Sequence, residues 1–194
     1  MSRRLFLNGL SETSPQTLTM QRRSFLSFAS TAASAAAFAH QSPALIHPVL
    51  SGADRLDEAH GLGITSIAFK VLTRDTNGEL FIIEHATRKK GGPPRHIHPH
   101  QDEWFYVMEG EFLFEVAHDR VTLRAGASIL APRNLPHAWA FVGNNRGKML
   151  ISYTPAGKME AFFREVTKSN SMPPENKDLF QRFDLILTGP PLLA

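Results

Sequence analysis

The hydrophobic and polar residues between about residues 64 and 154 form short segments in which the two kinds alternate. Phe112, Phe114 and Val116, for example, alternate with Glu111 and Glu115. This period of two predicts strands with one buried face and one mostly exposed face. Turn-forming residues separate the segments, so we expect an all-β barrel or sandwich. The predicted strands are Thr65–Leu72, Glu79–Ala86, Trp104–Met108, Glu111–Ala117, Arg120–Arg124, Ser128–Ala131, His137–Val142 and Lys148–Thr154.

The period changes after residue 156. Met159, Phe162, Phe163 and Val166 are spaced i, i+3, i+4 and i+7, which predicts an amphipathic helix. Its apolar face is expected to pack on the outside of the barrel, although an exposed partner-binding stripe has the same pattern. A second short helix is predicted over 176–183. The expected organisation is therefore an N-terminal arm over 40–62, a barrel over 63–156 and a helical tail over 157–194.

The first 39 residues are typical of a targeting segment. Gln21-Arg22-Arg23-Ser24-Phe25-Leu26 resembles a twin-arginine export motif, and the apolar run over 27–38 is too short to span a bilayer. Ala37-Phe38-Ala39 offers small residues for cleavage, with Met20 as an alternative start. A buried Ala-rich helix or a retained anchor would have similar composition. We expect a signal peptide over 1–39 and a periplasmic or secreted protein without further membrane contact.

Charge excludes an obvious nucleic-acid partner. The chain has 21 Lys and Arg against 18 Asp and Glu, but the signal holds four of the arginines and one of the acids. The remainder is therefore balanced at 17 basic and 17 acidic residues. There is no cysteine, so disulfides and thiolate ligands are excluded, and any metal would be bound by nitrogen and oxygen.

Four residues form a candidate metal site. His96 and His98 alternate on a strand and so face the same side, and Glu103 and His137 follow later in the chain. Three imidazoles and a carboxylate are typical ligands of divalent first-row metals. Each residue taken alone is equally compatible with a hydrogen-bonded polar group at a strand end.

The blocks over 92–111 and 126–137 resemble the two motifs of the cupin superfamily. Further similarity to the C-terminal part of quercetin dioxygenase-like single-domain cupins extends to the end of the chain. The resemblance implies a single conserved cupin β-barrel, a double-stranded β-helix of the jelly-roll type. It also implies that His96, His98, Glu103 and His137 converge on one ion. Two positions depart from the motif, since Asn134 replaces a glycine and Phe141 replaces a polar residue.

Strand parity indicates which other side chains share the inner wall. Phe105 lies on the face of Glu103, and Trp139 and Phe141 lie on the face of His137. These three are predicted to bind a planar or apolar substrate, although a barrel core has the same composition. Trp104 is expected to face outward with Tyr106.

Other polar residues are harder to assign. His100 is expected in a loop, with a substitute-ligand or base role as the alternative. Either Glu84 or His85 must face inward, whereas His60 and His118 are expected to be exposed.

The resemblance implies a metal-dependent dioxygenase, an oxidoreductase that binds O₂ and a flavonol- or enediol-like substrate. Glu103 would both bind the metal and accept a substrate proton. Folding before twin-arginine export would favour Mn, Fe or Ni, with Cu or Zn as alternatives. The other functions considered are an isomerase or lyase of small sugars or keto acids, and a non-catalytic metal- or ligand-binding protein. The family also admits a homodimer.

Overall fold

The computed structural model describes residues 47–63, 65–171 and 175–193. The predicted signal over 1–39 lies outside the described residues. The described elements are β1 (His60–Gly61), β2 (Thr65–Val71), a 3-10 turn (Thr73–Thr76), β3 (Phe81–Thr87), β4 (Pro94–Ile97), β5 (Asp102–Glu109), β6 (Glu111–Val116), β7 (Asp119–Arg124), β8 (Ser128–Ala131), β9 (His137–Phe141), β10 (Gly147–Thr154), α1 (Met159–Val166), α2 (Lys177–Arg182) and β11 (Ile186–Pro191).

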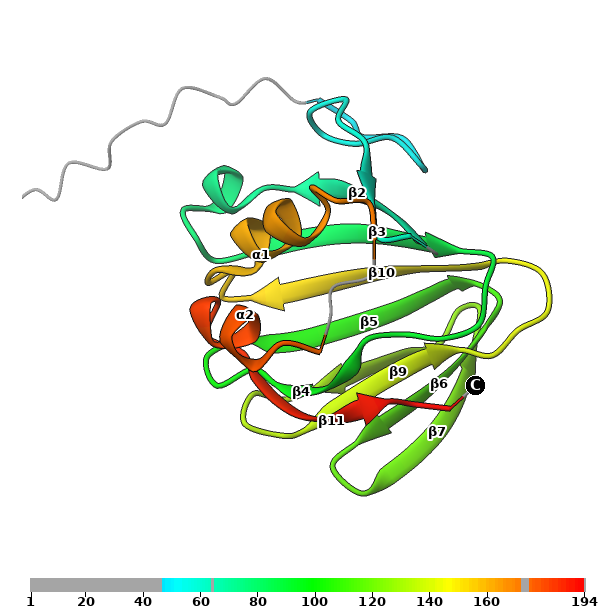
Figure 1. Cartoon of the computed structure of the whole chain (residues 1–194). Helices are drawn as coiled ribbons and strands as arrows, with labels where there is room; N and C mark the ends of the chain where they lie inside the picture. Colours follow the sequence, from blue (N-terminus) through cyan, green and yellow to red (C-terminus); the bar gives the residue numbers. More distant parts are fainter. Residues whose placement is uncertain (1–46, 64, 172–174, 194) are drawn as a thin grey trace, which may run out of the picture. The chain divides into compact units, whose positions relative to one another are not determined.

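The strands form two antiparallel sheets whose inner faces pack together (Figure 1). The first sheet has the order β1-β2-β3-β10-β5-β8, and the second has the order β11-β4-β9-β6-β7. Neighbours in each sheet are mostly distant in sequence, as expected for a jelly-roll barrel. The predicted all-β cupin-type barrel is therefore confirmed, and each of the eight predicted strands is present within a few residues.

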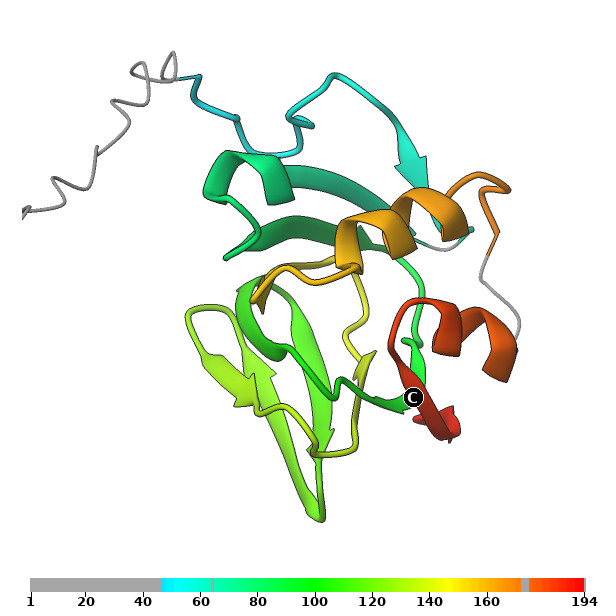
Figure 2. The same cartoon turned by 90° about the vertical axis from the view of Figure 1, so that its left-hand side faces the viewer.

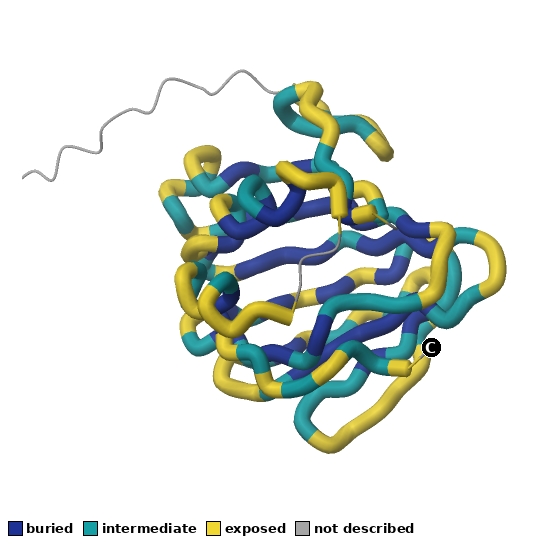
Figure 3. The backbone as a smooth tube through the Cα atoms, viewed as in Figure 1, coloured by how far each residue is buried: buried dark blue, intermediate teal, exposed yellow. Residues whose placement is uncertain are grey.

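The core between the sheets is strongly aromatic. Buried and outward residues alternate along β5, so that Phe105 and Val107 are buried while Trp104 and Tyr106 remain 37% and 36% exposed. The same alternation is visible along the central strands in Figure 3. The parity predicted for β5 is confirmed. The largest fully buried aromatic side chains are those of Phe69, Phe81, Phe105, Phe112, Phe114 and Phe141.

The two helices lie outside the sheets and across the space between them (Figure 2). The four apolar residues that predicted α1 are all buried. The ring of Phe163 lies 6.1 Å from that of Phe81 and 5.9 Å from that of Tyr153. Phe180 of α2 packs on Phe162 of α1, with ring centroids 5.6 Å apart. The helices therefore cover one opening of the barrel.

The tail over 157–194 is only partly helical. After α2 the chain forms β11, which pairs antiparallel with β4, so that Leu187 lies opposite His96. The Gly-Pro-Pro sequence at 189–191 is typical of a turn, but it lies at the edge of the sheet, where proline is tolerated. The tail thus adds a strand beside β4, which carries His96, and the sequence analysis did not predict this strand.

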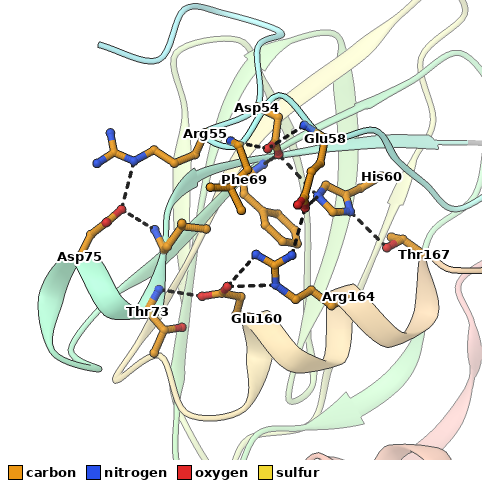
Figure 4. A network of polar contacts seen from close by, with 12 residues as sticks. Asp54, Arg55, Glu58, His60, Phe69, Thr73, Asp75, Glu160, Arg164 and Thr167 are labelled. Atoms are coloured by element: carbon orange, nitrogen blue, oxygen red, sulfur yellow. Dashed lines mark hydrogen bonds and ion pairs between the residues drawn. The ribbon is translucent and has the colours of Figure 1, made fainter. Parts of the chain in front are cut away.

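Residues 47–62 form an arm that is fixed to β2 and α1 (Figure 4). The Asp54 carboxylate accepts a hydrogen bond from the Phe69 amide, and Arg164 of α1 pairs with Glu58 at 3.0 Å. His60 stacks on Phe69 with ring centroids 4.1 Å apart, and its side chain is only 8% exposed. The prediction that His60 is exposed is wrong, because β1 adds to the sheet and α1 covers it. His118 is exposed as predicted.

None of the helices in the described part of the chain has the length and apolar character needed to cross a membrane.

Candidate metal centre

Three strands bring the four predicted ligands together. His96 lies on β4 and His98 directly follows it, whereas Glu103 lies on β5 and His137 begins β9. His96 and His137 are paired across β4 and β9, which explains how ligands 41 residues apart in the sequence meet. All four side chains are buried, and their ligand atoms lie within 4.8 Å of one another. The structure therefore groups the whole predicted ligand set.

The spacing of the ligand atoms fits one divalent ion. Glu103 Oε2 lies 2.8 Å from His137 Nε2 and 3.1 Å from His98 Nε2. The Nε2 atoms of His96 and His98 are 3.1 Å apart. Ligand atoms about 2.1 Å from an ion and at right angles to one another would be about 3.0 Å apart. These three separations match that value, whereas His96 Nε2 and Glu103 Oε2 lie farther apart, at 3.9 Å.

Backbone carbonyls set the orientation of two imidazoles. His96 Nδ1 lies 2.8 Å from the Pro94 carbonyl, and His137 Nδ1 lies 3.1 Å from the Leu135 carbonyl. A carbonyl only accepts hydrogen bonds, so Nδ1 must carry the proton in both rings. The neutral form of each ring therefore directs an Nε2 lone pair at the cluster. Such backbone contacts are the usual means of orienting histidine ligands.

The turn before His137 also holds the site. Asn134 replaces the glycine of the motif and adopts a left-handed conformation with φ 66°. Asparagine tolerates this conformation better than most residues. The backbone N–H of Asn134 donates a hydrogen bond to the His98 carbonyl at 2.9 Å, which joins the two motif loops. The departure from the motif at this position therefore leaves the turn intact.

The electrostatics of the four side chains favour an anionic Glu103 carboxylate. Burial opposes ionisation of Glu103, but hydrogen bonds from His137 and His98 and their charge hold its pKa well below the usual range. Burial also works against protonation of His137, yet its bond to Glu103 raises the pKa of that imidazole. Burial, together with the positive potential of His137 and His98, lowers the pKa of His96 to about 3. A bound cation would supply the positive charge that His137 otherwise provides.

Tyr153 is a site residue that the sequence analysis missed. It lies on β10 directly opposite Glu103, and its hydroxyl donates a hydrogen bond to that carboxylate. Burial and the Glu103 charge raise the pKa of Tyr153 well above its usual value, so the hydroxyl stays protonated. Only the register of β10 against β5 reveals the contact, and sequence gives no such register.

A cavity of about 80 Å³ lies beside the cluster. His96 and Glu103 form part of its wall, together with apolar residues of both sheets and of both helices. Its remaining polar lining side chains are those of Thr65, His85 and Tyr153. Of the two candidates on β3, His85 thus faces inward. Glu84 faces the other side and pairs with Lys70 and Lys148.

The three predicted substrate-binding residues occupy different positions. Trp139 lines the cavity, whereas Phe105 and Phe141 are fully buried and do not belong to its lining. Phe105 packs on Phe114 with ring centroids 5.1 Å apart, and Phe141 packs on Phe112 at 5.3 Å. Substrate binding by these residues stays a prediction, and it has geometric support for Trp139 alone. His100 is exposed and lies outside the four-residue cluster.

Comparison with known proteins agrees with this fold. Residues 85–153 match the family model described as "Cupin domain". A 60-residue stretch is 28% identical to "Polyketide synthase CurC" of Streptomyces cyaneus, covering 31% of this chain and 39% of that protein. The match thus spans about two fifths of the length of that curated relative.

Two solved structures illustrate the structural similarity. An RmlC-like cupin from Shewanella frigidimarina is 24% identical, with coverage of 53% of this chain and 87% of that chain and a TM-score of 0.45. A predicted oxalate decarboxylase from Thermotoga maritima is 16% identical, with 47% and 80% coverage and a TM-score of 0.45. The family match over 85–153, together with the two-sheet barrel and its four converging ligands, supports the cupin superfamily for this chain.

Proposed function

We propose that this protein is a metal-dependent dioxygenase acting on a small enediol- or diketone-like substrate. The observation that carries the proposal is the convergence of three imidazole nitrogens and a carboxylate oxygen within 4.8 Å. In their neutral forms His96 and His137 present lone pairs to the cluster, and Glu103 presents a carboxylate oxygen. A divalent ion held by these atoms would act as a Lewis acid for substrate and O₂.

The protein side chains would bind and orient the substrate. The anionic state of Glu103 suits a ligand, and its hydrogen bond from Tyr153 fixes the carboxylate against β10. Acceptance of a substrate proton by Glu103 is the second part of the proposal, because a carboxylate oxygen beside the ion lies within reach of a bound hydroxyl. The apolar walls from α1 and α2 would exclude water from the reacting atoms.

Size and polarity of the cavity favour a small, weakly polar substrate. The small cavity, of about 80 Å³, favours an acyclic or single-ring substrate over the three rings of a flavonol. A sugar would need many hydrogen-bonding partners, whereas the lining is mostly apolar. These features favour a small enediol or diketone over both a flavonol and a sugar, and so favour the dioxygenase over the sugar isomerase.

The test combines metal analysis with oxygen consumption. Purified protein should contain about one divalent metal per chain and consume O₂ with acetylacetone or a small enediol, but not under anaerobic conditions. His137→Ala should lose both metal and turnover, whereas His100→Ala, which changes an exposed imidazole outside the cluster, should keep both. Turnover without O₂ would favour the isomerase or lyase instead. Unchanged metal content in His137→Ala would refute the site.

Export is a separate part of the proposal. The Arg22-Arg23 motif supports twin-arginine export of folded protein, and loading in the cytoplasm supports Mn, Fe or Ni as the metal. In the native host, a variant with both arginines changed to lysine should remain uncleaved in the cytoplasm, and the wild-type N-terminus should be His40. Copper at unit occupancy in periplasmic protein would refute the metal assignment.

A further inference from the structure

The cavity has a second polar region, separated from the metal cluster by apolar side chains. Strand register orders the inner wall into three rows. The first row holds Glu103 and Tyr153, and the next holds Ile151 and Ile83. The third row holds His85 on β3. Ile83, Ile151, His85 and Glu103 all line the same cavity, so it has polar groups at two ends and an apolar middle.

His85 lacks the hydrogen bonds expected of a structural core histidine. It is 3% exposed, and its Nδ1 has no hydrogen-bond partner among the described residues. The ring instead packs edge-on against Trp139, with centroids 4.8 Å apart, and against Phe112 at 6.5 Å. Buried polar groups in native proteins are nearly always paired, so an exception inside a cavity indicates a missing partner.

Thr65 repeats this pattern on the neighbouring strand. Its Oγ1 is also buried without a partner in the described part of the chain, and the residue lines the same cavity. His85 pairs with Ile67 across β2 and β3, two residues from Thr65, so that the two side chains lie on the same wall. Two unpaired polar groups therefore lie at the end of the cavity distant from Glu103.

We propose that His85 and Thr65 bind a hydroxyl or carbonyl at the far end of the substrate whose other end binds the metal. This inference rests on the proposed function and narrows its substrate class to small hydroxyketones or diketones with one further neutral oxygen. Among the described residues that line the cavity there is no lysine or arginine, so a distal carboxylate would be unpaired and is excluded.

The protonation state of His85 agrees with a neutral partner. Burial lowers the pKa of His85 to about 3. The neutral ring therefore offers one N–H donor and one acceptor lone pair, and a threonine hydroxyl offers the same pair of functions. A substrate hydroxyl can satisfy both side chains at once.

Two related chelators test the proposal. Kojic acid and allomaltol share the same hydroxyketone, but kojic acid has a hydroxymethyl group where allomaltol has a methyl group. Zinc-loaded wild-type protein should bind kojic acid about five- to tenfold more tightly in isothermal titration calorimetry, the effect of one buried hydrogen bond. The ring ¹⁵N signals of His85 should shift with kojic acid and stay in place with allomaltol.

Variants assign that preference to the two side chains. His85→Leu and Thr65→Val should each reduce the preference for kojic acid, and the double variant should abolish it, with zinc content and allomaltol affinity unchanged. His85→Gln should restore part of the preference, since the amide still donates and accepts. His118→Gln, at an exposed turn, is the matched control and should behave as wild type.

The outcomes separate this inference from the proposed function. Equal affinity of the wild type for the two chelators, or an unchanged preference in the double variant, would overturn the role of His85 and Thr65 while leaving the metal site intact. Failure of both chelators to bind zinc-loaded protein would overturn the substrate class. Absence of zinc from the wild type would overturn the proposed function and this inference with it.

Discussion

Replacing Glu84 by glutamine should destabilise the protein by leaving two largely buried ammonium groups, those of Lys70 and Lys148, without their counter-charge. Glu84 is 3% exposed on the outer face of β3. Its carboxylate lies 2.9 Å from Lys148 Nζ and 3.3 Å from Lys70 Nζ, and it accepts a hydrogen bond from the Gly52 amide at 2.9 Å. Lys148 also reaches Ser51 of the arm. One buried carboxylate therefore joins three segments.

The expected loss in free energy of unfolding depends on which contacts remain in the Glu84→Gln variant. Glutamine retains an acceptor for the Gly52 amide but removes the negative charge between two ammonium groups. Breaking a buried pair on one side costs about 3–5 kcal/mol. Lys70 keeps two carbonyl partners, those of Leu50 and Ala53, which reduces the loss. We expect the free energy of unfolding to fall by about 2–3 kcal/mol, or Tm to fall by roughly 5–10 °C.

The dependence on pH has a definite sign. Burial opposes ionisation of Glu84, but hydrogen bonds from Lys148 and Lys70 and their charges lower its pKa below the usual value. A lowered pKa in the folded state stabilises the protein above the unfolded pKa of about 4.3 and loses that effect as pH falls below it. The gap between wild type and Glu84→Gln should therefore be constant from pH 7 to about 5 and shrink in stronger acid.

Urea unfolding followed by circular dichroism at several pH values measures this gap. Glu79→Gln is the matched control, because Glu79 is an exposed carboxylate two residues before β3, and it should change stability little at any pH. A loss below about 1 kcal/mol at pH 7 in Glu84→Gln would contradict the reasoning, given the cost of unpaired buried charge. A stability difference between wild type and Glu84→Gln that widens in acid would also contradict the reasoning.

Three further predictions concern the site and its supports. Mn²⁺ at about 100 times its Kd should stabilise the protein by about 2.7 kcal/mol in thermal melts. EDTA or the His137→Ala substitution should remove that gain in stability. Persistence of the gain in His137→Ala would refute the site. Gly92→Ala should lower both stability and metal affinity, because the added Cβ would lie 1.8 Å from the carbonyl of Trp139, on the strand that carries His137. Gly189→Ala is the control, since its Cβ would have no contact under 3.6 Å. Equal stability and metal affinity of the two variants would refute this packing. Phe163→Ala should cost about 3–4 kcal/mol in urea unfolding, since its buried ring packs on Phe81 and Tyr153, and a loss under 1 kcal/mol would contradict that packing.

The strands and α1 could be predicted because both depend on local pattern. Because side chains alternate along a strand, Phe105 and Glu103 lie on the same face of β5, and this does not depend on which strand pairs with β5. The structure confirms this placement. The amphipathic spacing of α1 is local in the same way. The assembly of the four ligands was predicted only through the resemblance of two motifs, since no local pattern brings His137 to His96.

The features that were missed depend on pairing between distant segments. Tyr153 meets Glu103 through the register of β10 against β5, and β11 joins β4 from beyond two helices. His60 is buried because an arm strand and α1 meet over it. Composition near each residue gives no sign of such contacts. A run of Gly and Pro at 189–191, for example, favours a turn in sequence yet lies on an edge strand.

Phe141 shows how position changes the functional argument. Phe141 replaces a polar residue of the motif, and loss of a polar group from the site would favour a non-catalytic binding protein. His137 begins β9 and Phe141 ends it, so the two residues lie at different ends of the strand. The Phe141 ring packs on Phe112 and against Gly147. It does not line the cavity. A polar group at that position would enter the apolar core rather than the site, so the substitution removes nothing that the proposed chemistry requires. The polar contacts available to a substrate come instead from Tyr153, His85 and Thr65. The departure from the motif therefore gives no reason to prefer the non-catalytic interpretation.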